Sequence, residues 1–177
     1  MNHVVTEERS ELCELLRQAR EIAAPAGWRF TVKVWALGDP IQWVIESKLR
    51  DPNTGNLVFN KEHDHMPKRD YYLIDFELHD ASGLELRFQP NPMNAFWVAM
   101  GDREYMPPCP SSAAYSDQIY AICDDSNGRV LTVRNDDMDE RLFSYSLNFV
   151  SDVDNKEHRC DPGGENKNGN YVYRYDY

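Results

Sequence analysis

The sequence contains no apolar run close to the ~18 residues that a membrane-spanning helix needs. Its first residues also lack the apolar stretch and cleavage signal of a secretory peptide. Cysteine is scarce, with 4 among 177 residues, and no two are spaced as a C-x-x-C pair. These absences predict a soluble, cytoplasmic protein without disulfides, whose free thiols are Cys13, Cys109, Cys123 and Cys160.

Basic residues are few as well. The 19 lysines and arginines stand against 30 aspartates and glutamates, which gives a formal net charge of −11 at pH 7. Such a charge repels the phosphates of nucleic acids and of anionic membranes before contact, and we expect neither as a partner. The shares of hydrophobic residues (41%) and aromatic residues (12%) are typical of a folded chain, and the length predicts one domain.

The usual sequence signatures of catalysis are absent. The chain has no G-x-S-x-G nucleophile turn, no G-x-x-x-x-G-K-[ST] phosphate loop and no G-x-G-x-x-G dinucleotide motif. Neither Cys109 nor Cys123 has a neighbouring histidine in the sequence that could activate its thiol. The pattern therefore favours a protein that is not an enzyme, and no catalytic residue is predicted.

Residues 1–27 have the pattern of one amphipathic helix. Thr6 is suited to cap its N-terminus, and Pro25 and Gly27 end the pattern. Apolar side chains recur every three or four residues between these limits, with charged side chains opposite. This helix must bury its apolar side either on the domain or on a second copy of the chain.

From residue 28 to residue 150 the apolar residues alternate with polar ones, which is the pattern of strands with one buried face. Residues 101–117 break this pattern and contain three prolines, so we expect a long connection that crosses between sheets. The fold is predicted to be mainly β, an antiparallel two-sheet β-sandwich of about eight or nine strands that follows the N-terminal helix. The expected strands span residues 28–37, 41–50, 57–60, 71–80, 84–89, 95–100, 118–123, 129–135 and 142–150.

Residues 151–177 form a separate polar region, rich in glycine and asparagine. The run YVYRYDY at its end could form a final strand with its tyrosines on one side. The predicted organisation is therefore a helix over residues 1–27, a β-sandwich domain over residues 28–150 and a polar C-terminal tail over residues 151–177.

A histidine pair is the first candidate metal site. His63 and His65 flank Asp64, and residues two apart in an extended loop point the same way, so both imidazoles could bind one zinc or copper ion. His79, on the outward face of the next expected strand, could supply a third ligand if the loop folded back. The alternative is a solvent-exposed loop without metal.

Acidic turns are the second candidate. Asp124 and Asp125 form one cluster, and Asp136, Asp137 and Asp139 form another, each offering the oxygen ligands that calcium prefers. Neither has the full EF-hand spacing, and aspartate also forms turns without metal. The acidity is concentrated in turns of the C-terminal half, which predicts one strongly negative end of the sandwich that attracts cations or a basic partner.

Aromatic residues outside the expected core are candidates for an interaction surface. Exposed aromatic clusters are a common mark of protein or carbohydrate contacts. The alternative is that these rings lie between the sheet and the N-terminal helix. The residues concerned are Trp35, Tyr171, Tyr173, Tyr175 and Tyr177.

The second half of the chain resembles small bacterial proteins in which a long sandwich strand leads to a closing Asp-Pro element. The strand lies in LTVRNDDMDERLFSYSLNFV at residues 131–150, and the closing element is DPGGEN at residues 161–166. This pattern is similar to the DP-EP family, although Gly-Gly-Glu-Asn follows the Asp-Pro and the chain has no Glu-Pro. GDPIQW at residues 38–43 resembles the G-D-x-I-x-W stretch of inclusion-body proteins of the PixA and AidA type. Both resemblances imply a β-sandwich, and neither supplies catalytic residues.

Together these features predict a non-enzymatic, cytoplasmic, bacterial β-sandwich that acts as a protein-interaction or self-assembling module. The expected partner is a second copy, giving a homodimer, or another protein. One alternative is a metal-binding protein or metal-dependent hydrolase that uses the loop of His63 and His65. Another is a small-ligand or carbohydrate-binding module that uses exposed aromatics. No cofactor is expected, and a divalent metal belongs to the first alternative only.

Overall fold

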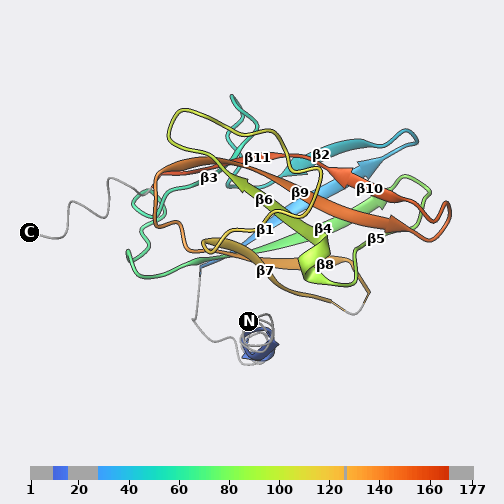
Figure 1. Cartoon of the computed structure of the whole chain (residues 1–177), viewed down its shortest axis with the longest axis horizontal. Helices are drawn as coiled ribbons and strands as arrows, with labels where there is room; N and C mark the ends of the chain where they lie inside the picture. The colour runs from blue at the N-terminus through green and yellow to red at the C-terminus, as the bar shows by residue number, and fades with distance from the viewer. Residues whose placement is uncertain (1–9, 16–27, 126, 168–177) are drawn as a thin grey trace, which may run out of the picture.

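The structure of the protein, a computed structural model, describes residues 10–15, 28–125 and 127–167, and two β-sheets enclose its core (Figure 1). Sheet A has five strands in the order β2-β1-β4-β8-β7. Its strands are β1 (Trp28–Leu37), β2 (Gln42–Glu46), β4 (Tyr72–Ala81), β7 (Ile119–Asp124) and β8 (Val130–Asn135).

Sheet B is built around its longest strand, β9 (Arg141–Ser151). Strands β10 and β11 pair with one edge of β9, and β5 and β6 pair with the other, while β3 pairs with β11. One turn of helix, α2 (Pro92–Ala95), leads into β6. The remaining strands are β3 (Leu57–Phe59), β5 (Leu86–Phe88), β6 (Phe96–Met100), β10 (Glu157–Cys160) and β11 (Gly163–Asn166).

The mainly β fold is confirmed, but the prediction that all strands are antiparallel is wrong. β1 and β4 are parallel neighbours along their whole length, and β11 and β3 form a second parallel pair. Between β1 and β4 the chain forms β2 in sheet A and β3 in sheet B, and then re-enters sheet A at the end where β1 began. Side chains alternate in the same way in both kinds of pairing, so alternation could not reveal the direction.

The number of strands also exceeds the expected value of about eight or nine, because the polar region after residue 150 adds β10 and β11 to sheet B. Their polar sequences conceal them. Gly164 of β11 lies under the ring of Phe143 in β9, and a Cβ at Gly164 would clash with that ring. Asn166 is buried and exchanges hydrogen bonds of 2.8 and 3.2 Å with Asn135 of sheet A. The closing segment 171–177 lies outside the described residues.

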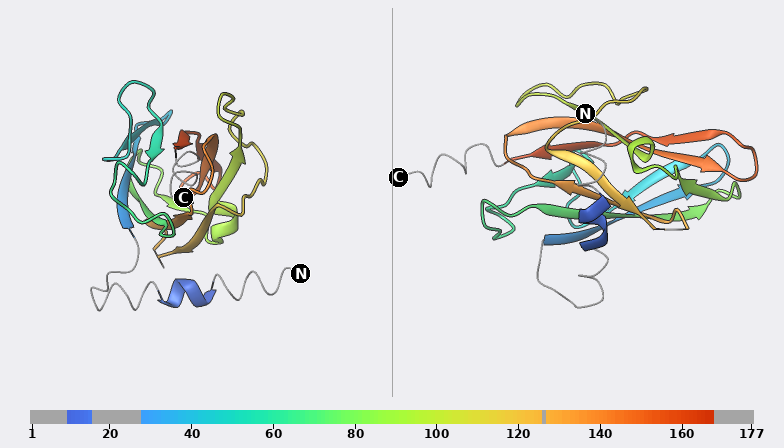
Figure 2. Two further views of the ribbon diagram at one scale, coloured as in Figure 1. Left: turned by 90° about the vertical axis from the view of Figure 1, so that its left-hand side faces the viewer. Right: turned by 60° about the horizontal axis from the view of Figure 1, so that its bottom comes forward.

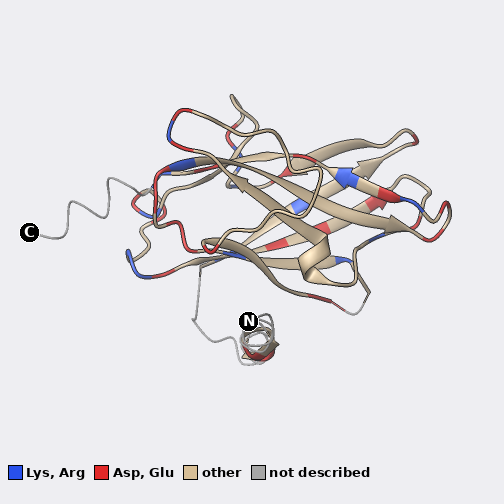
Figure 3. Ribbon diagram, viewed as in Figure 1, with Lys and Arg blue, Asp and Glu red and all other residues tan. Residues whose placement is uncertain are grey.

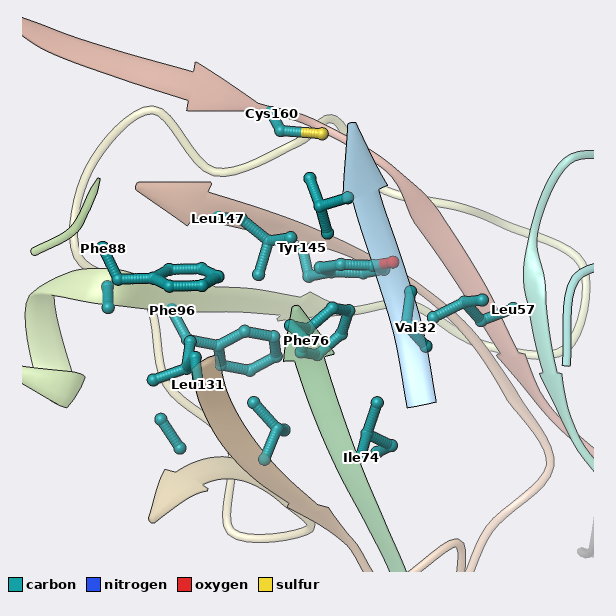
Figure 4. Packing of buried hydrophobic residues seen from close by; sticks show 14 of the residues in the cluster. Val32, Leu57, Ile74, Phe76, Phe88, Phe96, Leu131, Tyr145, Leu147 and Cys160 are labelled. Atoms are coloured by element: carbon teal, nitrogen blue, oxygen red, sulfur yellow. The ribbon is translucent and has the colours of Figure 1, made fainter. Parts of the chain in front are cut away.

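The core lies between the two sheets and receives side chains from both (Figure 4). Phe76 of sheet A packs against Phe96 and Tyr145 of sheet B, with ring centroids 6.4 and 5.7 Å apart. Trp43 of sheet A stacks on Phe149 of sheet B at 5.0 Å. The alternation in the sequence therefore identified the inward faces of these strands correctly.

A second, smaller apolar cluster lies on the outer face of sheet A, where residues 10–15 form a helical segment (Figure 2). Leu12 and Cys13 of this segment pack against Leu73, Ile122 and Cys123. This contact explains why Leu73 is buried on a face that its alternation with Tyr72 and Ile74 predicts to be outward. The rest of the predicted helix lies outside the described residues, and none of the helices that are described could span a membrane.

Residues 101–118 form the expected long connection from β6 in sheet B to β7 in sheet A. This connection lies over the outer face of sheet B (Figure 2). Ser144 and Ser146 of β9 hold it there by donating hydrogen bonds to the carbonyl oxygens of Pro107 and Pro110 at 2.5 and 2.7 Å.

The turn after β4 depends on the Asp80 carboxylate. Its oxygens accept hydrogen bonds from the backbone and hydroxyl of Ser82 at 2.9 and 2.6 Å, and from the Leu86 backbone at 2.8 Å. Burial acts to raise the pKa of Asp80, but these hydrogen bonds outweigh it and lower the pKa below its ordinary value of 3.8. Because the folded pKa is depressed, this carboxylate stabilises the fold above its unfolded pKa, and the contribution disappears as pH falls through the folded pKa.

We expect Asp80→Asn to lower the free energy of unfolding at pH 7 by about 1–2 kcal/mol, since the charged acceptor is lost. The variant should also lose less stability than the parent protein as the pH falls from about 4 to about 2. Urea unfolding at several pH values measures both effects. The exposed Asp117→Asn serves as the control, and equal acid sensitivity of Asp80→Asn and the parent protein would contradict the prediction.

Candidate functional site

The structure does not bring together the three histidines predicted as metal ligands. His63 and His65 lie in the loop before β4, where the His63 side chain is 84% exposed. His79 lies near the far end of β4, about 23 Å along the strand from its start, and its ring stacks on Trp35 at 4.5 Å. Among the described residues no three histidine, cysteine or carboxylate side chains cluster as metal ligands. Metal binding through His63, His65 and His79 therefore stays a prediction that this geometry does not support.

The predicted calcium residues lie at opposite ends of β8, so the expectation of one negative end is wrong (Figure 3). Asp124 and Asp125 stand at the β7–β8 turn, whereas Asp136, Asp137 and Asp139 follow the other end of β8. The six residues of β8 separate the two clusters by about 20 Å. The two acidic clusters therefore cannot form one joint cation site.

Most of these carboxylates serve local structure. Asp125 accepts two backbone N–H groups of its own turn at 2.7 and 3.2 Å. Asp136 pairs with Arg134 at 2.6 Å, and Asp139 accepts a hydrogen bond from the Gln118 amide at 2.7 Å. Turn and ion-pair chemistry thus accounts for these three residues without a metal.

A buried lysine that no sequence pattern predicts lies beside the second acidic cluster. Lys61 is 1% exposed, and its Nζ donates hydrogen bonds to the carbonyl oxygens of Lys68 and Asp136 at 2.9 and 2.6 Å. Burial lowers the pKa of Lys61, against the opposing charges of Asp137, Asp136 and Asp70. This buried network joins the loop before β4 to the β8–β9 turn. Because solvent does not reach the Lys61 amine, we assign the network a structural role.

Trp35, the aromatic residue predicted for interactions, makes its contacts within sheet A. Its Nε1 donates a hydrogen bond to Glu46 at 3.2 Å, and its ring stacks on His79. The other predicted aromatic residues, Tyr171, Tyr173, Tyr175 and Tyr177, lie outside the described residues. An aromatic platform made by these five rings is therefore not visible in this part of the chain.

Two thiols are kept protonated by their surroundings. Burial, and then the charge of Asp161, raise the pKa of Cys109, whose Sγ donates a hydrogen bond to the Asp161 carbonyl at 3.2 Å. The same two causes raise the pKa of Cys160 to about 12. Neither sulfur is a thiolate near neutral pH, so neither has the form that nucleophilic catalysis requires.

A groove on the outer face of sheet B is the best candidate site in the described part of the chain. Its cavity volume is about 440 Å³. It lies over β6, β9 and β10, which are neighbours in sheet B (Figure 1). We call it the Trp97 groove, and it is lined by Gln89, Asn94, Trp97, Asn148, Glu157, His158 and Arg159.

Three planar side chains from three adjacent strands form the centre of the Trp97 groove. Arg159 of β10 lies opposite Asn148 of β9, and its Nε donates a hydrogen bond to the Asn148 Oδ1 at 3.0 Å. The guanidinium then extends over β9 to the Trp97 ring of β6, with its central carbon 4.9 Å from the ring centroid. Such a cation–π contact holds the guanidinium in one orientation.

Two of the three groups, Asn148 and Trp97, are anchored further. Asn148 is only 5% exposed, and its Nδ2 donates a hydrogen bond to the Asn94 carbonyl at 2.8 Å. The Nε1 of Trp97 donates one to the Met93 carbonyl at 3.2 Å. Because both acceptors, Met93 and Asn94, belong to α2, this short helix fixes one wall of the groove.

The rim of the groove carries a carboxylate, that of Glu157, and the imidazole of His158. Glu157 accepts a hydrogen bond from the Gln89 amide at 3.3 Å. His158 pairs with Asp154 at 2.9 Å. Hydrogen bonds from the Lys156 backbone N–H and from His158 lower the pKa of Asp154. They outweigh burial, which acts to raise it. Hydrogen-bonding side chains thus surround the planar centre.

Most residues of the Trp97 groove have no distinctive signal in the sequence. Residues 95–100 are expected as a strand, and alternation with inward Phe96 and Val98 places Trp97 on the outer face, but its apolar neighbours in AFWVAM do not distinguish it as a site residue. Arg159 belongs to the region interpreted as a polar tail. Its position opposite Asn148 depends on the register between β9 and β10, for which one sequence holds no signal.

The sequence matches no protein-family model and no curated protein. The two family resemblances therefore stay predictions, and function has to be argued from the geometry of the Trp97 groove.

Proposed function

We propose that this protein is a β-sandwich that binds a small, hydroxyl-rich ligand of the saccharide class in the Trp97 groove and does not transform it. One observation carries the proposal, namely the row of fixed planar groups formed by Trp97, Asn148 and Arg159. Sugars present apolar C–H faces that pack on flat rings, and pairs of hydroxyls that planar amide, carboxylate and guanidinium groups bind.

The dimensions and lining of the groove support this class of ligand. Small-molecule sites have volumes of about 300–1,000 Å³, and the 440 Å³ of the Trp97 groove fall within that range. The lining contains hydrogen-bond donors and acceptors in nearly every side chain. A purely apolar ligand would leave those groups without water or partner, which disfavours its binding.

Titration with a panel of neutral, N-acetylated and acidic saccharides tests the proposal. A monosaccharide that fits should bind with a dissociation constant of about 1 mM or lower, as its size allows. Trp97→Ala should weaken that binding at least about tenfold, because the stacking surface and the support of Arg159 are both removed. Calorimetry and tryptophan fluorescence measure the affinity.

Trp35→Phe is the matched control, because Trp35 lies on the outer face of sheet A and should not affect the affinity. Unfolding curves of both variants show that each is folded. The proposal fails if no saccharide saturates the protein, or if Trp97→Ala binds the ligand as well as the parent protein does.

The other hypotheses drawn from the sequence stay predictions. Homodimer formation through the helix would have less apolar surface to bury, since Leu12 and Cys13 already pack against the chain's own sheet A. A metal-dependent activity has no cluster of ligands among the described residues. The bacterial origin and cytoplasmic location have no structural counterpart to argue from.

A further inference from the structure

Arg159 differs in its partners from five of the eight other arginines in the described part of the chain. Asn148 and Trp97 hold it, and both are neutral. No carboxylate lies within ion-pair distance of Arg159 in the described part of the chain, although the protein has 30 acidic residues. Five other arginines pair with carboxylates: Arg29 with Asp75, Arg87 with Asp152, Arg103 with Glu140, Arg134 with Asp136 and Arg141 with Asp139.

The contacts of Arg159 occupy the Nε and one face of its guanidinium, and they do not involve its two terminal nitrogens. Its Nε is occupied by Asn148, and one of its faces meets the Trp97 ring. The two terminal nitrogens have no acceptor among the described residues, and they belong to a side chain that lines the groove. That pair of nitrogens is the edge with which arginine binds a carboxylate through two parallel hydrogen bonds.

The negative charges around Arg159 favour a ligand with one negative charge over a ligand with two. Glu157 lies two residues away on the same strand, and it is bound by the neutral Gln89 rather than by Arg159. It would repel a dianion such as a phosphate more strongly than a carboxylate. The overall charge of −11 adds to this preference, although salt screens it beyond about 8–10 Å.

We propose that Arg159 binds a carboxylate on the ligand, so that the Trp97 groove selects acidic saccharides of the hexuronate class over their neutral counterparts. This inference rests on the proposed function and adds the group that decides specificity. In such a complex the sugar ring would contact the planar groups, and the carboxylate would replace the water that hydrates the guanidinium edge.

Matched sugars that differ only at the acid test this selectivity. Glucuronate should bind at least about tenfold more tightly than glucose, and galacturonate more tightly than galactose, because a charged, bidentate contact is added. Arg159→Gln should weaken glucuronate binding about 10- to 100-fold and glucose binding by a smaller factor, because glutamine keeps a planar amide that can bind hydroxyls but loses the charge. The preference for the acid should also shrink as salt is added.

Arg87→Gln is the control, because this exposed arginine of β5 lies outside the groove lining and pairs with Asp152. Arg159→Lys keeps the charge but loses the planar edge, and it should restore only part of the acid preference. Equal binding of glucuronate and glucose, or equal loss of both in Arg159→Gln, overturns the inference and leaves the proposed function standing. Absence of binding by every sugar overturns both.

Discussion

Replacement of Lys61 by methionine is expected to lower the free energy of unfolding by about 3–5 kcal/mol. The Lys61 amine is enclosed at 1% exposure and donates to two backbone carbonyls, those of Lys68 and Asp136. Asp137, also 1% exposed, exerts the strongest of the charges that favour its protonated form. Methionine fills a similar volume but leaves a buried carboxylate without the lysine charge and two carbonyls without their donor.

A second substitution separates the loss of charge balance from the loss of packing. In the double variant Lys61→Met, Asp137→Asn the uncompensated carboxylate is gone, so it should be more stable than Lys61→Met alone by about 1–2 kcal/mol. Asparagine suits position 137, where φ is +47°, because it tolerates the left-handed region well. Urea unfolding followed by fluorescence and circular dichroism measures all the variants.

The exposed Lys48→Met is the matched control and should stay within about 0.5 kcal/mol of the parent protein. A loss below about 1 kcal/mol in Lys61→Met would show that the amine is not part of an essential ionic network. No recovery in the double variant would instead assign the loss to the two carbonyls and to packing.

Replacement of Phe149 by alanine is expected to cost about 3–5 kcal/mol of unfolding free energy. The ring is fully buried in β9 of sheet B. It stacks on Trp43 of sheet A at 5.0 Å and packs against Phe88 of β5 at 4.6 Å. Alanine would leave a cavity at a contact that joins both sheets, and neighbouring rings cannot collapse into it without moving a strand.

Phe149→Leu keeps most of the volume and should cost about 1–1.5 kcal/mol, which provides a graded comparison. Val153→Ala is the surface control, because Val153 is 54% exposed in the turn after β9. The measurement is urea unfolding with the slope compared between variants. If Phe149→Ala and Phe149→Leu lost the same amount of stability, the cavity argument would be wrong.

Most of the core, but little of the Trp97 groove, could be predicted from the sequence. Alternation placed Phe76, Tyr145 and Phe149 in the core, where the structure has them. The same alternation applied to Trp97 points to the outer face, so this one residue of the groove was within reach of the sequence. Arg159 and Asn148 could not be identified in this way, because only the register of β9 and β10 places these two polar residues opposite each other.

The mainly β character and the inward faces of the strands follow from the sequence alone, because side-chain direction repeats every two residues along a strand. The three-dimensional fold sets which strands are neighbours. It made β1 and β4 parallel, drew β10 and β11 into sheet B and enclosed Lys61. The Trp97 groove belongs to this second category, since its groups come from three strands whose pairing depends on contacts between distant parts of the chain.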